Sequence, residues 1–198
     1  MRVIAGELRG RLLRAPPGEG TRPMLDRVRE ALFATLQPWL EGAQVLDLFA
    51  GSGALGIEAL SRGGRHARFV ERNARACACL EENVSALALD DAVELVRADA
   101  LQATSWGERA PDVVFFDSPY PLLDELRTRR ALFAAMDELV RARLAPEGVL
   151  VFHALHRAVT RGEFAADLVV RERMYGSNSL WYVQREELAG AAPEAREP

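Results

Sequence analysis

The chain has 198 residues, of which 49% are hydrophobic and 27% are charged, as is usual for a folded globular domain. This composition excludes a disordered chain, a collagen and a coiled coil, and no apolar run approaches the ~20 residues of a membrane span. Residues 1–7 lack the apolar segment of a secretory signal, so we expect a cytoplasmic protein. Cys77 and Cys79 lie two apart in a helix-like run, which predicts buried thiols and no metal site.

The net charge of −4 is unevenly distributed along the chain. Residues 1–29 contain seven arginines and three acidic residues, a net charge of +4, so the remainder carries −8. All 25 basic residues are arginine, whose planar guanidinium can bind a phosphate through two hydrogen bonds. A basic N-terminal segment on an acidic body predicts either contact with a polyanion or a solvated charged flap, and charge alone leaves both open.

Residues 1–42 predict an N-terminal extension made of a β-hairpin and a helix. Residues 2–5 and 8–14 alternate weakly between apolar and polar side chains, with glycines as turn residues. A loop over residues 15–20 leads to a helix with Asp26 as its N-cap and with Pro38 distorting or ending its last turn. Apolar side chains recur in it at helical spacing: Val28, Ala31, Leu32, Leu36, Trp39 and Leu40.

From residue 43 to residue 187, apolar strands alternate with helices. Strands are expected at 44–49, 67–71, 93–96, 112–116 and 149–152, helices at 54–61, 73–87 and 123–144, and a closing hairpin at 168–174 and 180–184. This order predicts an α/β domain with a Rossmann-like, mostly parallel sheet and an antiparallel last strand. The tail of residues 188–198 is expected to be disordered.

A glycine-rich motif follows the first expected strand. Residues 51–56 match G-x-G-x-x-G, and Glu71 ends the next strand. Such glycines let the backbone pass close to a nucleotide, and the carboxylate can bind two ribose hydroxyls, in a NAD site or in an S-adenosylmethionine site. Asp47 distinguishes between these two kinds of site, because a negative charge beside the loop repels the pyrophosphate of NAD but suits the cationic sulfonium of S-adenosylmethionine. The sequence therefore favours S-adenosyl-L-methionine, with S-adenosyl-L-homocysteine as product, over NAD.

The expected donor-binding residues lie at the ends of three strands. They are Asp47, Phe49, Ala50, Gly51, Ser52, Gly53, Glu71, Arg72, Asp99 and Ala100. Asp99 is expected to accept a hydrogen bond from the adenine amino group. An Asp at this place can equally cap a helix, and both roles can hold together.

The fourth expected strand runs into Asp117-Ser118-Pro119-Tyr120. An exocyclic amino group is a weak nucleophile, but the Asp117 carboxylate and the Ser118 carbonyl can accept its two hydrogens and orient its nitrogen. Tyr120 can stack on an extruded base. We therefore expect these four residues to form the methyl-acceptor site, the alternative being a structural turn. His153, at the tip of the fifth strand, is expected to have a structural role.

Several stretches resemble the bacterial 16S rRNA (guanine-N2)-methyltransferases. They are residues 47–63, 9–11, 21–23 and 26–33, and an ending with Tyr175-Gly176, Leu180 and Tyr182. The resemblance spans residues 2–184 and implies a seven-stranded methyltransferase domain over 43–187, with S-adenosylmethionine as donor. The family's acceptor motif begins Asp-Pro-Pro, whereas Ser118 replaces the first proline here. Because Ser118 precedes Pro119 it is held near extended geometry, so we expect activity to survive.

The resemblance implies transfer to a guanine of 16S rRNA in the small ribosomal subunit. We expect Arg9, Arg11 and Arg22 to contact the RNA backbone, and Arg27 to contact RNA or to pair with Glu30. A monomer that binds no membrane is expected. Three rival functions stay open: methylation of an amino group on DNA adenine or protein glutamine, NAD-dependent oxidoreduction, and RNA binding without catalysis.

Overall fold

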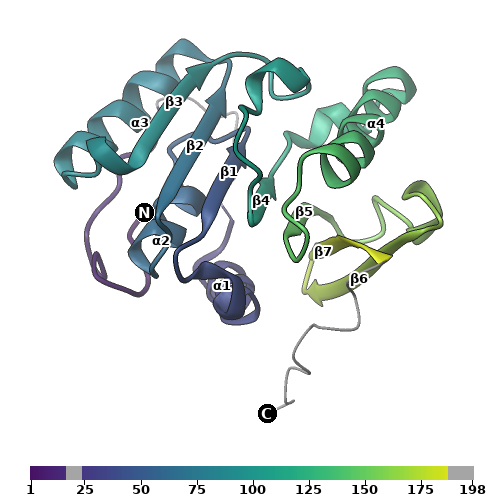
Figure 1. Ribbon diagram of the computed structural model, residues 1–198, viewed down its shortest axis with the longest axis horizontal. Coiled ribbons are helices and arrows are strands. Elements are labelled where there is room, and N and C mark those ends of the chain that lie inside the picture. Colours follow the sequence, from purple (N-terminus) through teal and green to yellow (C-terminus); the bar gives the residue numbers. More distant parts are fainter. Residues whose placement is uncertain (17–23, 187–198) are drawn as a thin grey trace.

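A seven-stranded sheet with the order β3-β2-β1-β4-β5-β7-β6 forms the centre of the molecule (Figure 1). The computed structural model describes residues 1–16 and 24–186. The strands are β1 (Gln44–Leu48), β2 (His66–Glu71), β3 (Val93–Arg97), β4 (Val113–Phe116), β5 (Val149–Leu155), β6 (Leu168–Tyr175) and β7 (Asn178–Arg185). β1 to β5 pair in parallel, and β7 runs antiparallel to both β5 and β6. The predicted mixed sheet with an antiparallel last strand is confirmed.

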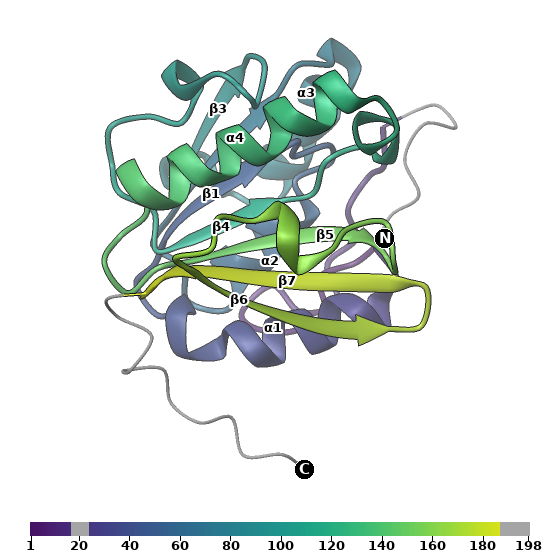
Figure 2. The same ribbon diagram turned by 90° about the vertical axis from the view of Figure 1, so that its right-hand side faces the viewer.

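Helices cover both faces of this sheet. They are α1 (Asp26–Leu40), α2 (Ala54–Ser61), α3 (Ala74–Ala86) and α4 (Leu126–Ala142), with short 3-10 helices η1 (Asp90–Ala92), η2 (Ala103–Ser105), η3 (Tyr120–Leu123) and η4 (Arg161–Glu163). Apolar residues of α1, α2 and α3 share one core with the sheet, and those of α4 share the other. Figure 2 shows α1 and α4 on opposite sides of β5 and β7.

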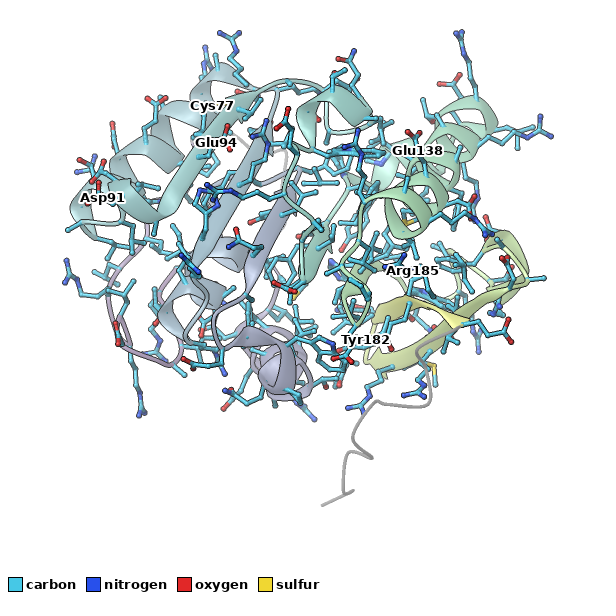
Figure 3. The ribbon with its side chains drawn as sticks, in the orientation of Figure 1. Cys77, Asp91, Glu94, Glu138, Tyr182 and Arg185 are labelled. Carbon is cyan, nitrogen blue, oxygen red and sulfur yellow. The ribbon has the colours of Figure 1, made fainter. Side chains whose placement is uncertain are left out.

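The alternation of strand residues decides which side chains face α1. Successive side chains point to opposite faces, so Phe115 and Val151 pack in the α1 core whereas Phe116 and Phe152 pack in the α4 core. Tyr182 on β7 belongs to the α1 core and lies close to α1 in Figure 3. By the same alternation, the polar residues Asp47 on β1 and His153 on β5 fall on the α1 face.

The expected N-terminal hairpin forms but is short. In residues 1–16, here called the arm, Arg2 and Leu12 form one antiparallel bridge, and backbone hydrogen bonds join Met1 to Leu13 and Val3 to Arg11, but neither side extends into a strand. The reason is that side chains of α2 bind the arm's backbone: Glu58 accepts the N–H groups of Ile4 and Ala5, and the Ser61 hydroxyl accepts another. The arm is therefore a short hairpin whose residues beyond the paired segment are docked on α2.

Asp26 does not cap α1, contrary to expectation. The N-cap residue is Leu25, which makes no side-chain cap bond, and the Asp26 carboxylate instead pairs with Arg29 at 3.2 Å. Asp26 is already the first residue of the helix, so its carboxylate does not act as the cap and instead pairs with an arginine that is 2% exposed. The helix continues two residues past Pro38. Most of the expected loop at 15–20, Arg22 and the tail at 188–198 lie outside the described residues.

The other expected elements shift only at their ends. Asn73 caps α3 as expected, its side chain accepting the N–H groups of Arg75 and Ala76. The long helix α4 begins three residues later than expected, because η3 occupies Tyr120–Leu123. Cys77 and Cys79 are buried free thiols on α3. Within the described residues no helix is long and apolar enough to cross a membrane, and no cluster of His, Cys, Asp or Glu could hold a metal ion.

Candidate active site

The glycine loop lies at the carboxyl end of β1, between β2 and β4, where the strand order reverses and α/β sheets bind ligands. Gly51 and Gly53 have φ of +57° and +78°, a region that L side chains rarely adopt. A Cβ on Gly51 would find open space apart from the Phe49 carbonyl, whereas one on Gly56 would lie 2.3 Å from the Phe69 ring. The loop therefore packs tightly on its inner side and leaves its backbone accessible at Gly51.

Asp47 lies beneath this loop and is only 1% exposed. Its Oδ2 accepts the N–H of Gly56 at 2.9 Å. Burial raises the pKa of Asp47 well above its usual value, which that hydrogen bond opposes and the charges of Asp117 and Glu71 reinforce. Asp117 and Glu71 thus repel a negative charge on Asp47 at one edge of the sheet. A cationic ligand would relieve this repulsion and a pyrophosphate would increase it, so the residues fit S-adenosylmethionine.

Glu71 links the ends of β1 and β2. Its Oε2 accepts the N–H of Gly51 at 3.0 Å and its Oε1 that of Asn73 at 2.7 Å. The carboxylate therefore borders the accessible part of the glycine loop, where a ribose would lie. The neighbouring Arg72 is exposed, and Ala50 and Ser52 are buried.

Asp99 lies beyond the end of β3, where it caps a turn and not a helix, since the N-cap residue of the next helix, η2, is Gln102. Its Oδ1 accepts the N–H of Leu101 at 3.0 Å, and the side chain stays half-buried. Ala100 next to it is buried. Phe49 has a positive φ of 62° and packs edge-on against Phe116, with ring centroids 5.4 Å apart.

The expected acceptor residues leave the sheet beside the glycine loop, because Phe116 on β4 pairs with Leu48 on β1. The Asp117 side chain is 34% exposed. Ser118 is buried, Pro119 is exposed and Tyr120 is half-buried at the start of η3. The structure therefore brings the predicted donor and acceptor residues to the same edge of the sheet.

For His153 the sequence predicts a structural role, but it did not show that this residue lies against Asp117. Phe116 pairs with Phe152, so the next residues on each strand, Asp117 and His153, are neighbours. The imidazole Nδ1 lies 2.8 Å from Asp117 Oδ1. In the sequence, Asp117 follows the apolar run of the fourth strand and His153 follows that of the fifth, but the order of the strands in the sheet was needed to bring the two together.

The arm borders the glycine loop. Met1 Sδ lies 3.7 Å from the Ser52 hydroxyl, and the Asn83 side chain on α3 binds both the Ser52 carbonyl and the backbone of Arg14. A ligand at this loop would therefore have the N-terminal segment beside it.

The predicted RNA-binding arginines differ in the contacts that their side chains make within the protein. Arg9 and Arg27 are exposed. Arg11 is exposed too, but its Nη2 donates to the Ala86 carbonyl at 2.9 Å. On the first turn of α1 the ion pair joins Arg29 to Asp26, instead of the expected pair between Arg27 and Glu30.

Replacing Asp47 by Asn should raise stability and weaken donor binding. The unfolded state of the wild type ionises at the usual Asp pKa and the folded state only at a higher one, so its stability falls as pH rises between the two values. Asn can still accept the Gly56 N–H but has no charge, so the variant should lack this fall. We expect a donor Kd about 10-fold higher, about 1.4 kcal/mol.

Urea denaturation of both proteins between pH 4 and pH 8 measures the first effect, and isothermal titration with S-adenosylmethionine measures the second. Parallel pH profiles of the two proteins would contradict the assignment of the raised pKa to Asp47.

Comparison with known proteins finds methyltransferases among the proteins to which this chain is similar. The family described as "Conserved hypothetical protein 95" matches residues 1–184. The "Putative rRNA methyltransferase YlbH" of Bacillus subtilis is 40% identical over 181 residues, 89% of this chain and 94% of that protein. The "Ribosomal RNA small subunit methyltransferase D" of Escherichia coli is 41% identical over 120 residues, 61% of this chain and 60% of that protein. The structure of "Putative methyltransferase yhhF from Escherichia coli" superimposes with a TM-score of 0.78 at 33% identity, covering 94% and 98% of the two chains. The predicted methyltransferase fold is confirmed.

Proposed function

The chain belongs to the Conserved hypothetical protein 95 family, and on that premise we propose that it methylates the N2 amino group of a guanine in 16S rRNA. The observation that carries the proposal is that Asp117 lies at the same edge of the sheet as Asp47 and Glu71, the two carboxylates that bind the glycine loop. The names of the relatives, which include an rRNA methyltransferase and a ribosomal RNA small subunit methyltransferase, support rRNA as the substrate.

On the acceptor side, Asp117 and Ser118 would hold the guanine amino group. Asp117 Oδ1 is bound to His153, so Oδ2 is the oxygen that would accept one N2 hydrogen, and the Ser118 carbonyl would accept the other. This fixes the direction of the nitrogen lone pair, and positioning of this kind supplies a large part of the barrier reduction. Oδ2 then takes the proton that N2 loses. Tyr120 would stack on the base.

On the donor side, S-adenosyl-L-methionine supplies an electrophilic methyl group on a cationic sulfur. The backbone of residues 51–53 would line its amino acid part, Glu71 would bind its ribose and Asp99 its adenine. Asp47 is buried behind the loop, so it would act by its charge. Arg72, Phe49 and Ala50 would border the nucleoside.

The decisive experiment offers donor with a labelled methyl group to unmodified small ribosomal subunits, naked 16S rRNA and duplex DNA. We expect label in N2-methylguanine of 16S rRNA, located by nuclease mapping and mass spectrometry. Label in DNA adenine or in a protein side chain would replace this substrate by one of its rivals. If the protein binds the donor but labels none of these substrates, the remaining candidate function is RNA binding without catalysis.

Arg9 and Arg27 are proposed to contact RNA phosphates. Replacing each by Gln should weaken RNA binding and lower the slope of log K against log salt concentration by about 1 per arginine. The reason is that binding releases fewer counterions from the RNA when one phosphate contact is missing. Arg11 is left unchanged because it also anchors the arm to Ala86. Filter binding at several salt concentrations gives the slope.

Arg143 offers the matched control for these variants. It is also exposed but follows the end of α4, at the edge of the sheet opposite the glycine loop. Arg143→Gln should leave the salt slope at the wild-type value. Equal changes in all three variants would mean that the whole surface, and not the arm and α1, attracts RNA.

A further inference from the structure

The buried imidazole of His153 connects the end of β4 with the start of β7. Its Nδ1 lies 2.8 Å from Asp117 Oδ1 and its Nε2 lies 2.9 Å from Asn178 Oδ1. The His153 side chain is 4% exposed, whereas that of Asp117 is 34% exposed. A rigid buried group therefore holds a carboxylate that otherwise faces solvent.

The sheet fixes the imidazole from both sides. His153 pairs with Leu180 on the antiparallel strand β7, and the parallel pairing of Phe116 with Phe152 places Asp117 beside it. The Tyr120 ring packs edge-on, with centroids 6.0 Å apart. The imidazole has little freedom to turn, so its two ring nitrogens have fixed directions.

We propose that His153, held by Asn178, is a positioning residue that fixes Asp117 Oδ1 and so aims Oδ2 at the amino group to be methylated. The proposal rests on the function proposed above. A partly exposed aspartate that follows a strand can rotate about two side-chain bonds, and each rotation moves its oxygens by more than the tolerance of a reacting geometry. With one oxygen bound to a buried donor, only the second remains for the substrate.

The charge state of His153 agrees with this arrangement. Both ring nitrogens face oxygen acceptors, so both donate when the imidazole is protonated. Burial opposes protonation, but the hydrogen bond and charge of Asp117 outweigh it and raise the pKa of His153 above its usual value. The titratable groups beside the imidazole are Asp117 and Tyr120, and β7 contributes the uncharged Asn178 and Leu180.

Two substitutions separate positioning from simple packing. In His153→Asn the amide nitrogen takes the place of Nδ1 and can still donate to Asp117. In His153→Gln the amide nitrogen takes the place of Nε2, near Asn178, and the bond to Asp117 is lost. We expect kcat to fall about 100-fold in the Gln variant and less than about 5-fold in the Asn variant. KM for the RNA substrate and Kd for the donor should change little in either.

His156→Gln is the control, because His156 lies three residues further on, half-buried, with its Nδ1 3.9 Å from Glu172. It should retain the wild-type kcat. A result in which the Asn variant is no more active than the Gln variant overturns the proposal, since packing alone would then explain the loss.

A second measurement needs no turnover, so it stays valid even if the proposed substrate is wrong or a His153 variant fails to fold. Nitrogen-15 NMR of the imidazole gives the pKa of His153 in the wild type and in Asp117→Asn. We expect a lower pKa in the variant, because a neutral amide replaces the carboxylate at Nδ1. An unchanged pKa would show that the bond does not form in solution and would overturn the proposal.

Discussion

Asp117→Ala should lower kcat for methyl transfer by about 10³-fold or more, the largest effect we expect for any single side chain. The substitution removes the acceptor of one amino hydrogen and the group that takes the released proton, and general-base contributions alone reach about 10²- to 10⁴-fold. It also leaves the imidazole of His153 without its carboxylate partner. Single-turnover transfer of labelled methyl to small subunits measures the loss.

Donor binding gives the internal check on this result. Asp117 lies on the acceptor side, so the Kd for S-adenosylmethionine should stay within about 3-fold of the wild type, less than 1 kcal/mol. Asp124→Ala is the matched control, because Asp124 is an exposed carboxylate just after η3, and it should transfer methyl at the wild-type rate. Turnover by Asp117→Ala at more than a tenth of that rate would remove Asp117 from the mechanism.

The sequence alone was sufficient to predict the strands and the glycine turn that carry the candidate site residues. One expected strand contains Asp47, the next ends in Glu71 and the fourth runs into Asp117, and these polar residues must meet because parallel strands end at one edge. The glycine motif adds the turn between β1 and α2. These signals are local, and each is decided within about ten residues of chain.

The contacts that the sequence did not show join residues far apart in the chain. Glu58 lies in the middle of the glycine-motif helix, where a helical pattern gives no reason to expect a carboxylate bound to the arm more than 50 residues away. The link between His153 and Asp117 likewise depends on which strand lies beside β5. The cap at Asp26 failed for a local reason, since the helix begins one residue earlier than a cap at Asp26 requires, and the carboxylate pairs with Arg29.

Glu58→Ala should lower the free energy of unfolding by about 3–5 kcal/mol, as expected when one partner of a buried ion pair is removed. Glu58 is completely buried. Its Oε2 accepts the Ile4 N–H at 2.7 Å, and its Oε1 accepts the Ala5 N–H at 3.0 Å and the Arg62 Nε–H at 2.9 Å. Alanine leaves two backbone donors and a guanidinium without their acceptor. Urea denaturation measures the loss.

The same substitution should release the arm, and trypsin can report this because the arm contains Arg9 and Arg11. We expect rapid cleavage after these arginines in Glu58→Ala at concentrations of trypsin that leave the wild-type arm intact.

Glu82→Ala is the control. It removes another contact of the arm, the exposed ion pair with Arg14, and should lower the free energy of unfolding by less than about 1 kcal/mol. A variant that is destabilised but keeps its arm protected would place the role of Glu58 within α2, through Arg62, and RNA binding would then be independent of it. If the arm is released, RNA affinity should fall while donor affinity falls less, because the glycine loop keeps its own bonds to Asp47 and Glu71.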